Sequence, residues 1–379
     1  MDYRKHGFTI VELLVVIVVI GILAAITIVS YTGISNKATL ASLQSDLSNT
    51  IKQLSLFYVQ NSAYPQTTDC NQALSATNLC IKSASTSNLI YTASPTNYQN
   101  YRLTTSNNGI SYSASANTTC PQNFIVVPGS TTYNTNDFCV MKYEAKQVGT
   151  STTPVSQISG TPWVSISQTS AIANSANVVG CSGCHLITEA EWMTIVQNVL
   201  SEHSNWSTNV VGSGYIYSGH NDNVPTNSLA SAADSDPYSG TGNVSGNQKR
   251  TLTLTNGEVI WDLAGNVWEW TSGTVQSPTV QPGITGTGGN WREWNVVSNP
   301  GTIVPNPSAA NTGITGANNW TTANGIGLVY SNTEQTGLLG FFRGGYWGNA
   351  ANNNAGVLGL YIIFGPGGTG DFLGFRVTK

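Results

Sequence analysis

The feature that most constrains this chain is an uncharged apolar run near its N-terminus. From Leu13 to Asn36 no residue carries a charge, and most side chains are Val, Ile, Leu or Ala. A helix needs about 20 apolar residues to cross a bilayer, so this run is long enough to span one. The short segment before it carries Arg4 and Lys5, which predicts that this end stays on the cytoplasmic side.

The residues at the start of this run differ from those of a common secretory signal, in which a small-residue cleavage site follows the apolar core. Here Gly7 precedes the run, and a single carboxylate, Glu12, lies at its beginning. A charge within a membrane helix is costly, so Glu12 is a functional candidate. Cleavage after Gly7 would free the amine of Phe8, and in a packed filament Glu12 could pair with that amine on a neighbouring subunit. The alternative is an ordinary membrane anchor.

Residues 7–16, Gly-Phe-Thr-Ile-Val-Glu-Leu-Leu-Val-Val, resemble the cleavage and methylation motif of type IV pilins and pseudopilins. The resemblance implies that a prepilin peptidase cuts between Gly7 and Phe8, that the Phe8 amine is methylated, and that Glu12 serves in assembly. It also implies a single-pass protein of the inner membrane before assembly. Afterwards the N-terminal helix would contact other pilin subunits in an extracellular pilus at the cell surface.

Downstream, the pattern predicts a small pilin-like unit that closes near Ala116. Apolar residues recur at steps of three and four, which favours a continuation of the helix with one apolar face; they are Leu40, Leu43, Leu47, Ile51, Leu54 and Tyr58. The helix should end before Tyr64-Pro65, because the residue before a proline disfavours helix. Short strand-like alternation follows at residues 89–91, 101–103 and 110–114. The expected domains are a leader (1–7), a pilin-like helix with a small sheet (8–116) and a second domain (117–379).

Composition favours an exported protein. The 379 residues suffice for about two domains. Only 8% of them are Asp, Glu, Lys or Arg, against about 25% in an average soluble domain. With a net charge of −4 and no basic stripe, the chain is not expected to bind nucleic acid.

Cysteine usage agrees with export. In an exported protein, six cysteines at these spacings predict up to three disulfides, whose pairing the sequence does not determine. Cys70 and Cys80 are expected to pair across a loop. The alternative is six reduced thiols in a cytosolic protein. The cysteines are Cys70, Cys80, Cys120, Cys139, Cys181 and Cys184.

From Cys120 onward, short apolar runs alternate with many Gly, Asn, Ser and Thr residues. One helix is predicted to begin after Thr188, which acts as the N-cap, with Glu191 completing a capping box. The apolar stripe of this helix comprises Trp192, Ile195, Val196 and Val199.

Three segments resemble signatures of the formylglycine-generating enzyme (sulfatase-modifying factor) family, a variant of the C-type lectin fold. They are residues 184–192, residues 260–271, and residues 343–347 together with 374–377, and residues 138–144 resemble the opening strand. The most specific part is Gly-Asn-Val-Trp-Glu-Trp at 265–270. The resemblance covers residues 120–379. It implies an α+β chain, in which a long pilin helix and a small antiparallel sheet precede a lectin-like domain rich in irregular structure.

Enzymatic activity is not expected to accompany this resemblance. The enzymes of the family use a redox-active cysteine pair near the C-terminus, yet no cysteine follows Cys184 here. The histidines His185, His203 and His220 lack the spacing of a ligand set. Cys181 and Cys184 form a C-x-x-C pair, but they lie where the family has an ordinary loop, so a structural disulfide is expected. We expect a scaffold that requires no cofactor.

Calcium is the one metal that the resemblance brings into question, because proteins of this fold often carry structural Ca²⁺. Asn266, the Val267 carbonyl and Glu269 offer oxygen ligands of the kind that calcium prefers. The alternative is that Asn266 and Glu269 only form hydrogen bonds with the local backbone.

The last 37 residues suggest a frame around a variable segment. Trp347 and Phe375 are expected to be buried in the frame. Between Gly348 and Phe372 there is no Lys, Glu, Trp or Gln. Mutation of the adenines in an Asn codon cannot produce any of these four residues. The segment resembles the variable region of proteins diversified by retroelements, which place it at the end of a C-type lectin fold.

By that resemblance, exposed and randomised ligand-binding positions are expected within residues 346–372. They are Tyr346, Gly348, Asn349, Asn352, Asn354, Leu358, Leu360, Tyr361, Ile363, Phe364, Gly368, Gly370, Asp371 and Phe372. Exposed aromatic side chains offer a large contact area at low rotamer cost. The alternative is that residues 357–364 form a buried core strand.

These observations predict a type IV pilin-like filament subunit that displays a non-catalytic, hypervariable domain. That domain would attach the cell to a protein or glycan ligand on another cell. Two alternatives remain open, a pseudopilin of a secretion system and a surface-displayed formylglycine-generating oxidase. A domain of this size on every shaft subunit would crowd a filament, which favours a minor or tip position.

Overall fold

The computed structural model describes most of the chain. The described residues are 10–83, 87–93, 98, 101–107, 110–116, 120–121, 123–233, 248–277, 288–294, 321–332, 334–348 and 354–379. Within the first part of helix α1 the backbone is described, but few side chains are. Helices and several sheets are both present, so the expectation of an α+β chain is confirmed.

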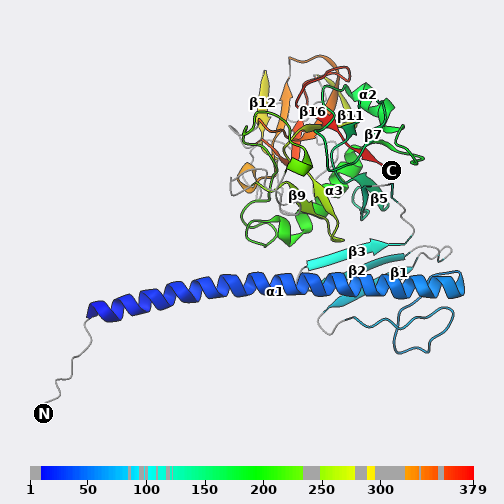
Figure 1. Ribbon diagram of the computed structural model, residues 1–379, viewed down its shortest axis with the longest axis vertical. Coiled ribbons are helices and arrows are strands. Elements are labelled where there is room, and N and C mark those ends of the chain that lie inside the picture. The colour runs from blue at the N-terminus through cyan, green and yellow to red at the C-terminus, as the bar shows by residue number, and fades with distance from the viewer. Residues whose placement is uncertain are drawn as a thin grey trace, which may run out of the picture.

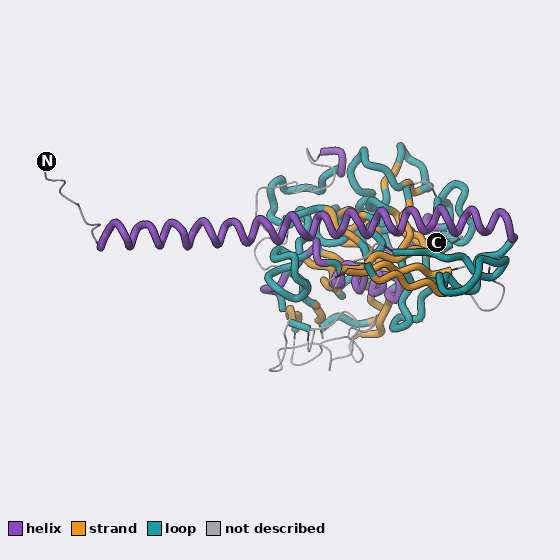
Figure 2. Tube along the Cα trace, turned by 90° about the horizontal axis from the view of Figure 1, so that it is seen from below, coloured by secondary structure: helices purple, strands orange, loops and turns teal. Residues whose placement is uncertain are grey.

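The N-terminal part consists of one long helix and a small sheet (Figure 1). Helix α1 spans Ile10–Asn61 and ends before Tyr64-Pro65, as predicted. The antiparallel sheet β1-β2-β3 is formed by Asn88–Ala93, Tyr101–Asn107 and Ile110–Ser115, in agreement with the predicted strands. The second half of α1 lies along this sheet, whereas its first half extends beyond the rest of the molecule (Figures 1 and 2).

The predicted apolar face of α1 packs on the sheet. Leu43, Leu47 and Leu54 are buried, and Ile51 and Tyr58 pack against them. Tyr64 and Tyr101 contact edge to face, with ring centroids 4.7 Å apart. The side chain of Leu40 lies outside the described residues. Among the residues that the structure describes, no helix is both long enough and apolar enough to cross a membrane.

The part of the chain from residue 120 onward, here called the head, contains the larger sheets. Six strands are arranged in the order β12-β13-β15-β14-β11-β16. They span Gly289–Arg292 (β12), Val329–Asn332 (β13), Gly356–Tyr361 (β15), Gly337–Gly344 (β14), Trp268–Ser277 (β11) and Leu373–Phe375 (β16). Strand β11 has partners on both sides, since it pairs antiparallel with β14 and parallel with β16.

Smaller elements complete the head. A four-stranded sheet β4-β5-β17-β8 is formed by Phe124–Val127, Phe138–Met141, Val377–Thr378 and His185–Leu186. Two-stranded sheets join β6 (Lys146–Gln147) to β7 (Pro154–Val155) and β9 (Thr251–Thr253) to β10 (Val259–Trp261). The helices are α2 (Gln168–Ser175) and α3 (Glu189–Ser201), with short 3₁₀ turns at His203–Asn205, Ser231–Ala233 and Thr322–Asn324.

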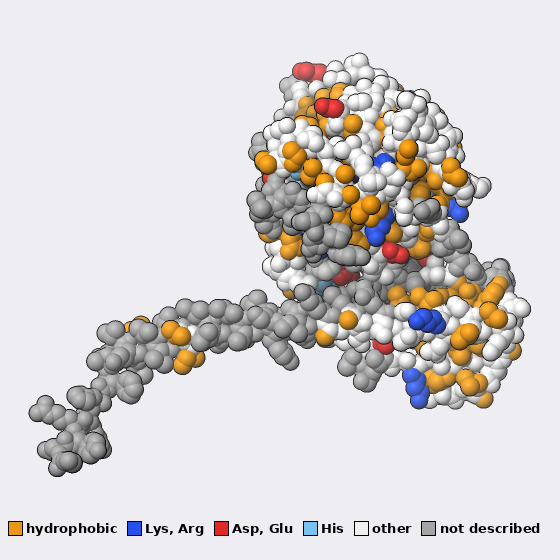
Figure 3. Space-filling view, viewed as in Figure 1, with side chains coloured by type: hydrophobic (Ala, Val, Ile, Leu, Met, Phe, Trp, Pro, Cys, Tyr) orange, Lys and Arg blue, Asp and Glu red, His pale blue; other side chains and the backbone are white. Residues whose placement is uncertain are grey.

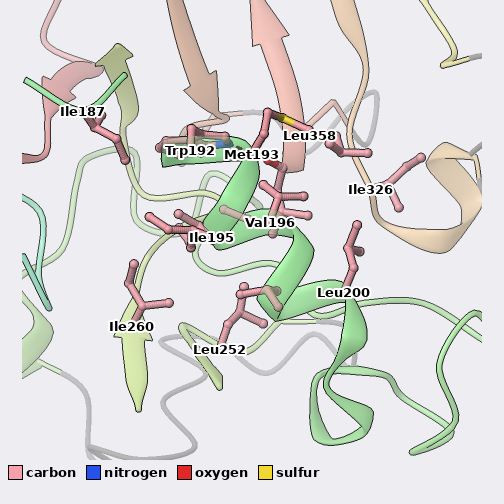
Figure 4. Packing of buried hydrophobic residues seen from close by; sticks show 14 of the residues in the cluster. Ile187, Trp192, Met193, Ile195, Val196, Leu200, Leu252, Ile260, Ile326 and Leu358 are labelled. Atoms are coloured by element: carbon pink, nitrogen blue, oxygen red, sulfur yellow. Dashed lines mark hydrogen bonds between the residues drawn. The ribbon is translucent and has the colours of Figure 1, made fainter. Parts of the chain in front are cut away.

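Helix α3 lies at the centre of the larger hydrophobic cluster. Its N-terminus has the predicted capping box, in which Thr188 accepts from the Glu191 amide and the Glu191 carboxylate accepts from the Thr188 amide. The predicted stripe is buried, and Figure 4 shows Leu252, Ile260 and Leu358 packed around the helix. The Trp192 indole donates to the Val357 carbonyl at 2.9 Å, which connects α3 to β15.

Three arginines are fully buried in the head, each paired with a carboxylate. Arg376 pairs with Glu269, Arg343 with Glu189, and Arg250 with Asp262. Each arginine also donates to backbone carbonyls. Because a guanidinium is costly to bury without such partners, these pairs connect specific strands to one another.

All six cysteines form disulfides, as the exported-protein interpretation predicted. The pairs are Cys70–Cys80, Cys120–Cys139 and Cys181–Cys184. The pairing follows sequence order, and Cys120–Cys139 fastens the beginning of the head to strand β5.

One surface ion pair predicts a pH-dependent stability. His185 Nε2 lies 3.1 Å from Glu191 Oε1, and this hydrogen bond raises the pKa of His185 above its ordinary 6.5. The pKa of Glu191 is lowered: burial would raise it, but the hydrogen bond and charge of His185, together with the hydrogen bonds from Thr188, outweigh burial. A raised histidine pKa stabilises the fold below the unfolded value, and the contribution is lost as pH rises through the folded value.

We therefore expect the wild-type head to lose stability between about pH 5.5 and about pH 8.5, and His185→Gln to lose less over the same interval. Urea denaturation at the two pH values measures the difference. Glu191→Gln keeps a side chain that can complete the capping box and should reduce the pH dependence in the same way. Equal pH dependence in all three proteins would contradict this assignment.

Candidate functional site

The C-terminal segment forms two strands of the large sheet and the loop between them. Strand β15 is buried from Gly356 to Leu360, and alternation appears only at its end, where Leu360 and Ile362 are fully buried and Tyr361 and Ile363 are half-buried. This alternation is the period of two of a strand with one face toward the core. The alternative of a buried core strand at residues 357–364 is therefore met for residues 357–360, whereas Tyr361, Ile363 and Phe364 are half-buried.

Three of the predicted exposed positions are wrong. Leu358 and Leu360 are 0% exposed and Asn354 is 3% exposed. Leu358 and Leu360 belong to the cluster around α3, as does Val357, because this stretch of β15 lies within the core. Asn349 and Asn352 lie outside the described residues. Trp347 was expected to be buried and is half-buried, whereas Phe375 is buried as predicted.

The other predicted positions lie at the surface, and several of them adjoin one another. Asp371 is exposed and the remaining ones are half-buried: Tyr346, Gly348, Tyr361, Ile363, Phe364, Gly368, Gly370 and Phe372. The aromatic ones are joined by two residues from other strands. We call the combined set the aromatic surface; it comprises Trp291, Tyr330, Tyr346, Trp347, Tyr361, Phe364 and Phe372.

At one end of the aromatic surface, three rings pack closely. Tyr361 stacks on Trp291 with centroids 5.1 Å apart and planes 4° apart. Tyr330 contacts Tyr361 at 4.6 Å and Trp291 at 5.2 Å between ring centroids, in both cases in an edge-to-face arrangement. Centroids this close leave no gap between the rings, so this end is a platform and does not enclose a ligand.

The other end continues through the loop. Phe364 lies 6.4 Å from Phe372, which in turn lies 5.3 Å from Tyr346, and Tyr346 contacts Trp347 at 5.2 Å. Two fully buried rings, Trp268 and Phe342, lie beneath and contact Tyr361 at 5.6 and 5.1 Å. The half-buried rings therefore rest on a rigid floor.

The electrostatics of this surface are nearly neutral. Asp371 is exposed within it, and half-buried Arg292 and Glu293, of opposite charge, follow Trp291. Figure 3 shows one face of the head, on which uncharged side chains predominate. Burial, followed by the neighbouring Tyr330 and Tyr346, raises the pKa of Tyr361 to about 12. Its hydroxyl therefore keeps its proton at neutral pH and can donate a hydrogen bond.

Sequence reasoning missed Trp291 and Tyr330. They lie in β12 and β13, far from the C-terminal segment in the chain, and join it through the pairing of β13 with β15. Only the pairing of strands brings them to Tyr361. In the sequence, each of them is only an aromatic residue in a stretch rich in Gly and Asn, and that context does not indicate that it contacts Tyr361.

The residues considered for calcium do not fit that ion. Both oxygens of Glu269 accept hydrogen bonds from Arg376, at 2.7 and 3.0 Å. Asn266 Oδ1 accepts from the Leu229 amide at 2.7 Å, and Asn266 Nδ2 donates to Glu144. The side-chain oxygens of Asn266 and Glu269 are thus occupied by protein partners. Within the described ranges, no group of three or more His, Cys, Asp or Glu side chains could hold a metal.

The N-terminal processing residues lie at the edge of the described structure. Gly7 and Phe8 are outside the described residues. Glu12 lies in the first turns of α1, and its side chain is not among those described.

Comparison with known proteins concerns this N-terminal part. Residues 2–28 match the family model "Prokaryotic N-terminal methylation motif". Type II secretion system core protein G of Dickeya chrysanthemi is 37% identical over 67 residues, which is 18% of this chain and 44% of that protein. The proteins of the same name from Pectobacterium carotovorum subsp. carotovorum and Klebsiella pneumoniae are 35% identical over 72 residues and 38% identical over 71 residues.

These matches cover 19% of this chain in both cases, and 46% and 51% of the two proteins. The chain therefore spans about half the length of the curated relatives it matches. The methylation motif and the similarity to core protein G both support a pilin or pseudopilin N-terminus. The N-terminal segment of this chain is of the pilin and pseudopilin type.

Proposed function

We propose that this chain is a type IV pilin-like filament subunit whose head binds a ligand on another cell through the aromatic surface. The observation that carries the proposal is the presence of two groups of half-buried rings that both pack on the buried ring of Phe342. Monomeric proteins rarely leave such apolar groups at the surface unless they mark an interaction site. Tyrosine and tryptophan also dominate the energetics of recognition surfaces.

The shape and charge of the surface indicate the kind of ligand. Rings that pack against one another form a platform, which suits a broad macromolecular partner such as a protein or glycan. The strand-loop-strand frame fits a C-type lectin-like head of the formylglycine-generating-enzyme type, and the half-buried positions fit the variable face of a retroelement-diversified protein. The head acts without catalysis, and the pairing of all six cysteines in disulfides supports this.

The filament part of the proposal rests on the N-terminal segment. After cleavage between Gly7 and Phe8 by a prepilin peptidase, the Phe8 amine is methylated and meets Glu12 of a neighbouring subunit. The apolar part of α1 then passes from the inner membrane into the filament, and the head is carried to the cell surface. Because the head is larger than the α1 unit, a minor or tip position suits it.

A second candidate is a pseudopilin of a secretion system, favoured by the similarity to type II secretion core protein G. In that case the head would contact other secretion components. Affinity purification of the full chain from its own cells separates the two. Recovery of secretion components alone favours the pseudopilin, whereas pilus subunits without secretion components favour the surface filament.

The sequences of this gene in sister isolates test the binding proposal. Variation should concentrate at half-buried and exposed positions of residues 346–372, such as Tyr361, Phe364 and Phe372. The inward neighbours Leu358 and Leu360 should remain apolar, because the core around α3 needs them. Diversity spread evenly along the gene, or equally frequent at Leu360 and Tyr361, would contradict the proposal.

A further inference from the structure

A buried lysine in the head has no hydrogen-bond partner. Lys146 lies in β6 and is 1% exposed, and its Nζ is without a hydrogen bond. Its nearest carboxylate oxygen is Glu144 Oε2, at 3.8 Å, which is beyond hydrogen-bond distance. A buried ammonium group without a hydrogen bond destabilises the fold, so a simple ion pair with Glu144 does not explain why Lys146 is buried.

The same carboxylate contacts a side-chain amide. Asn266 Nδ2 donates to Glu144 Oε2 at 2.6 Å, and both residues are buried, with exposures of 0% and 1%. The amine of Lys146 and the amide of Asn266 therefore meet at one carboxylate oxygen. We propose that Lys146 and Asn266 join spontaneously into an intramolecular isopeptide bond, with Glu144 as the proton carrier.

The protonation states suit this reaction. Burial lowers the pKa of Lys146, which favours the neutral amine that can act as a nucleophile. Burial also raises the pKa of Glu144 well above that of an ordinary carboxyl group. A protonated Glu144 can give its proton to a leaving nitrogen and then accept one from the attacking amine.

The amide is held in the position that an electrophile needs. Asn266 Oδ1 accepts a hydrogen bond from the Leu229 amide at 2.7 Å, which would stabilise negative charge on this oxygen during attack. Asn266 Nδ2 also donates to the Leu229 carbonyl at 3.1 Å, so the amide cannot rotate freely. Val267 donates its amide proton to Glu144 Oε1 at 3.3 Å and fixes the carboxyl group.

The other acids near Lys146 are engaged elsewhere. Asp262 accepts two hydrogen bonds from Arg250, and Glu269 accepts two from Arg376. Asn266 is thus the group that offers both a carbonyl carbon and a leaving nitrogen beside Glu144.

The step balances without any co-reactant. A bond forms between Lys146 Nζ and Asn266 Cγ, and the bond between Cγ and Nδ2 breaks. One proton passes from Nζ to Nδ2 through Glu144, so the leaving group is ammonia and Glu144 is regenerated. The product ties β6 to the turn before β11 by a covalent bond between segments far apart in the chain, which would resist mechanical unfolding of a head that holds a filament to a surface.

Mass spectrometry of the full chain purified in detergent tests the proposal. The folded wild-type protein should be lighter by one molecule of ammonia. Trypsin followed by chymotrypsin should release a branched peptide that contains both Lys146 and Asn266, since trypsin does not cleave after an acylated lysine. A branched peptide is required, because Asn266 could also lose ammonia by cyclising onto its own backbone.

Variants make the assignment specific. Lys146→Met and Glu144→Gln should each retain the full mass and yield no branched peptide, whereas Lys142→Met, a change at a nearby lysine, should leave the bond intact. Near-ultraviolet circular dichroism establishes that each variant is folded. A folded wild-type chain in which Lys146 is quantitatively unmodified would overturn the proposal, irrespective of how the variants fold.

Discussion

Replacing Arg376 with methionine is expected to lower the free energy of unfolding of the head by about 3–5 kcal/mol. Arg376 is 0% exposed and makes two hydrogen bonds to Glu269. It also donates to the Met141 carbonyl and to the Trp261 carbonyl, each at 2.8 Å. The substitution leaves the Glu269 carboxylate buried without its partner and removes a connection between β5, β10 and β11.

Urea denaturation followed by tryptophan fluorescence measures this loss, because all ten tryptophans lie at or after Trp163 and report on the head. Adding Glu269→Met to Arg376→Met should restore part of the stability, since a pair of apolar side chains carries no buried charge. The exposed Glu334→Gln is the control and should change stability by less than about 0.5 kcal/mol. If the losses in the free energy of unfolding of the two single variants add up in the double variant, the ion pair between Arg376 and Glu269 is not the cause of the destabilisation.

Leu373→Ala is expected to destabilise the head far more than Phe372→Ala, although the two residues are neighbours. Leu373 is 0% exposed in β16 and packs in the cluster with Trp268 and Phe375, so its truncation should cost about 2–5 kcal/mol. Phe372 is half-buried and contacts Tyr346 and Phe364 from the surface side. Aromatic pairs of this kind contribute about 0.5–1.5 kcal/mol each, so its truncation should cost less.

The difference in stability loss between the two variants bears on the proposed function, because a surface whose residues vary between isolates must tolerate substitution without unfolding the head. The same fluorescence-detected denaturation gives both values, and the contrast between the neighbours controls for local effects on the loop. Equal losses for the two variants would mean that Phe372 serves the core, and the aromatic surface would then be a poor site for diversification.

Local patterns predicted the elements that depend on neighbouring residues. The capping box at Thr188 and Glu191, the end of α1 before Tyr64-Pro65 and the apolar stripe of α3 all follow from contacts within a few residues. The disulfides were also expected, although their pairing was left open, because spacing does not determine which sulfur atoms meet.

The errors arose where distant segments meet. Leu358 and Leu360 were expected at the surface because composition cannot tell that β15 is buried between other elements of the head. Trp291 and Tyr330 were missed because they reach Tyr361 only through strand pairing. Nothing in the sequence indicated that Arg376, far along the chain, donates to both oxygens of Glu269, one of the residues considered for calcium.

By itself, the sequence determined that this chain has a pilin-type N-terminal segment, a long helix and a disulfide-bonded head, since motif, periodicity and composition are local properties. Only the tertiary structure decided which C-terminal side chains face the solvent and which polar groups meet in the core. The physical reason is that strand register assigns alternate residues to opposite faces, and that buried charges are satisfied by whichever partners the packed sheets bring together.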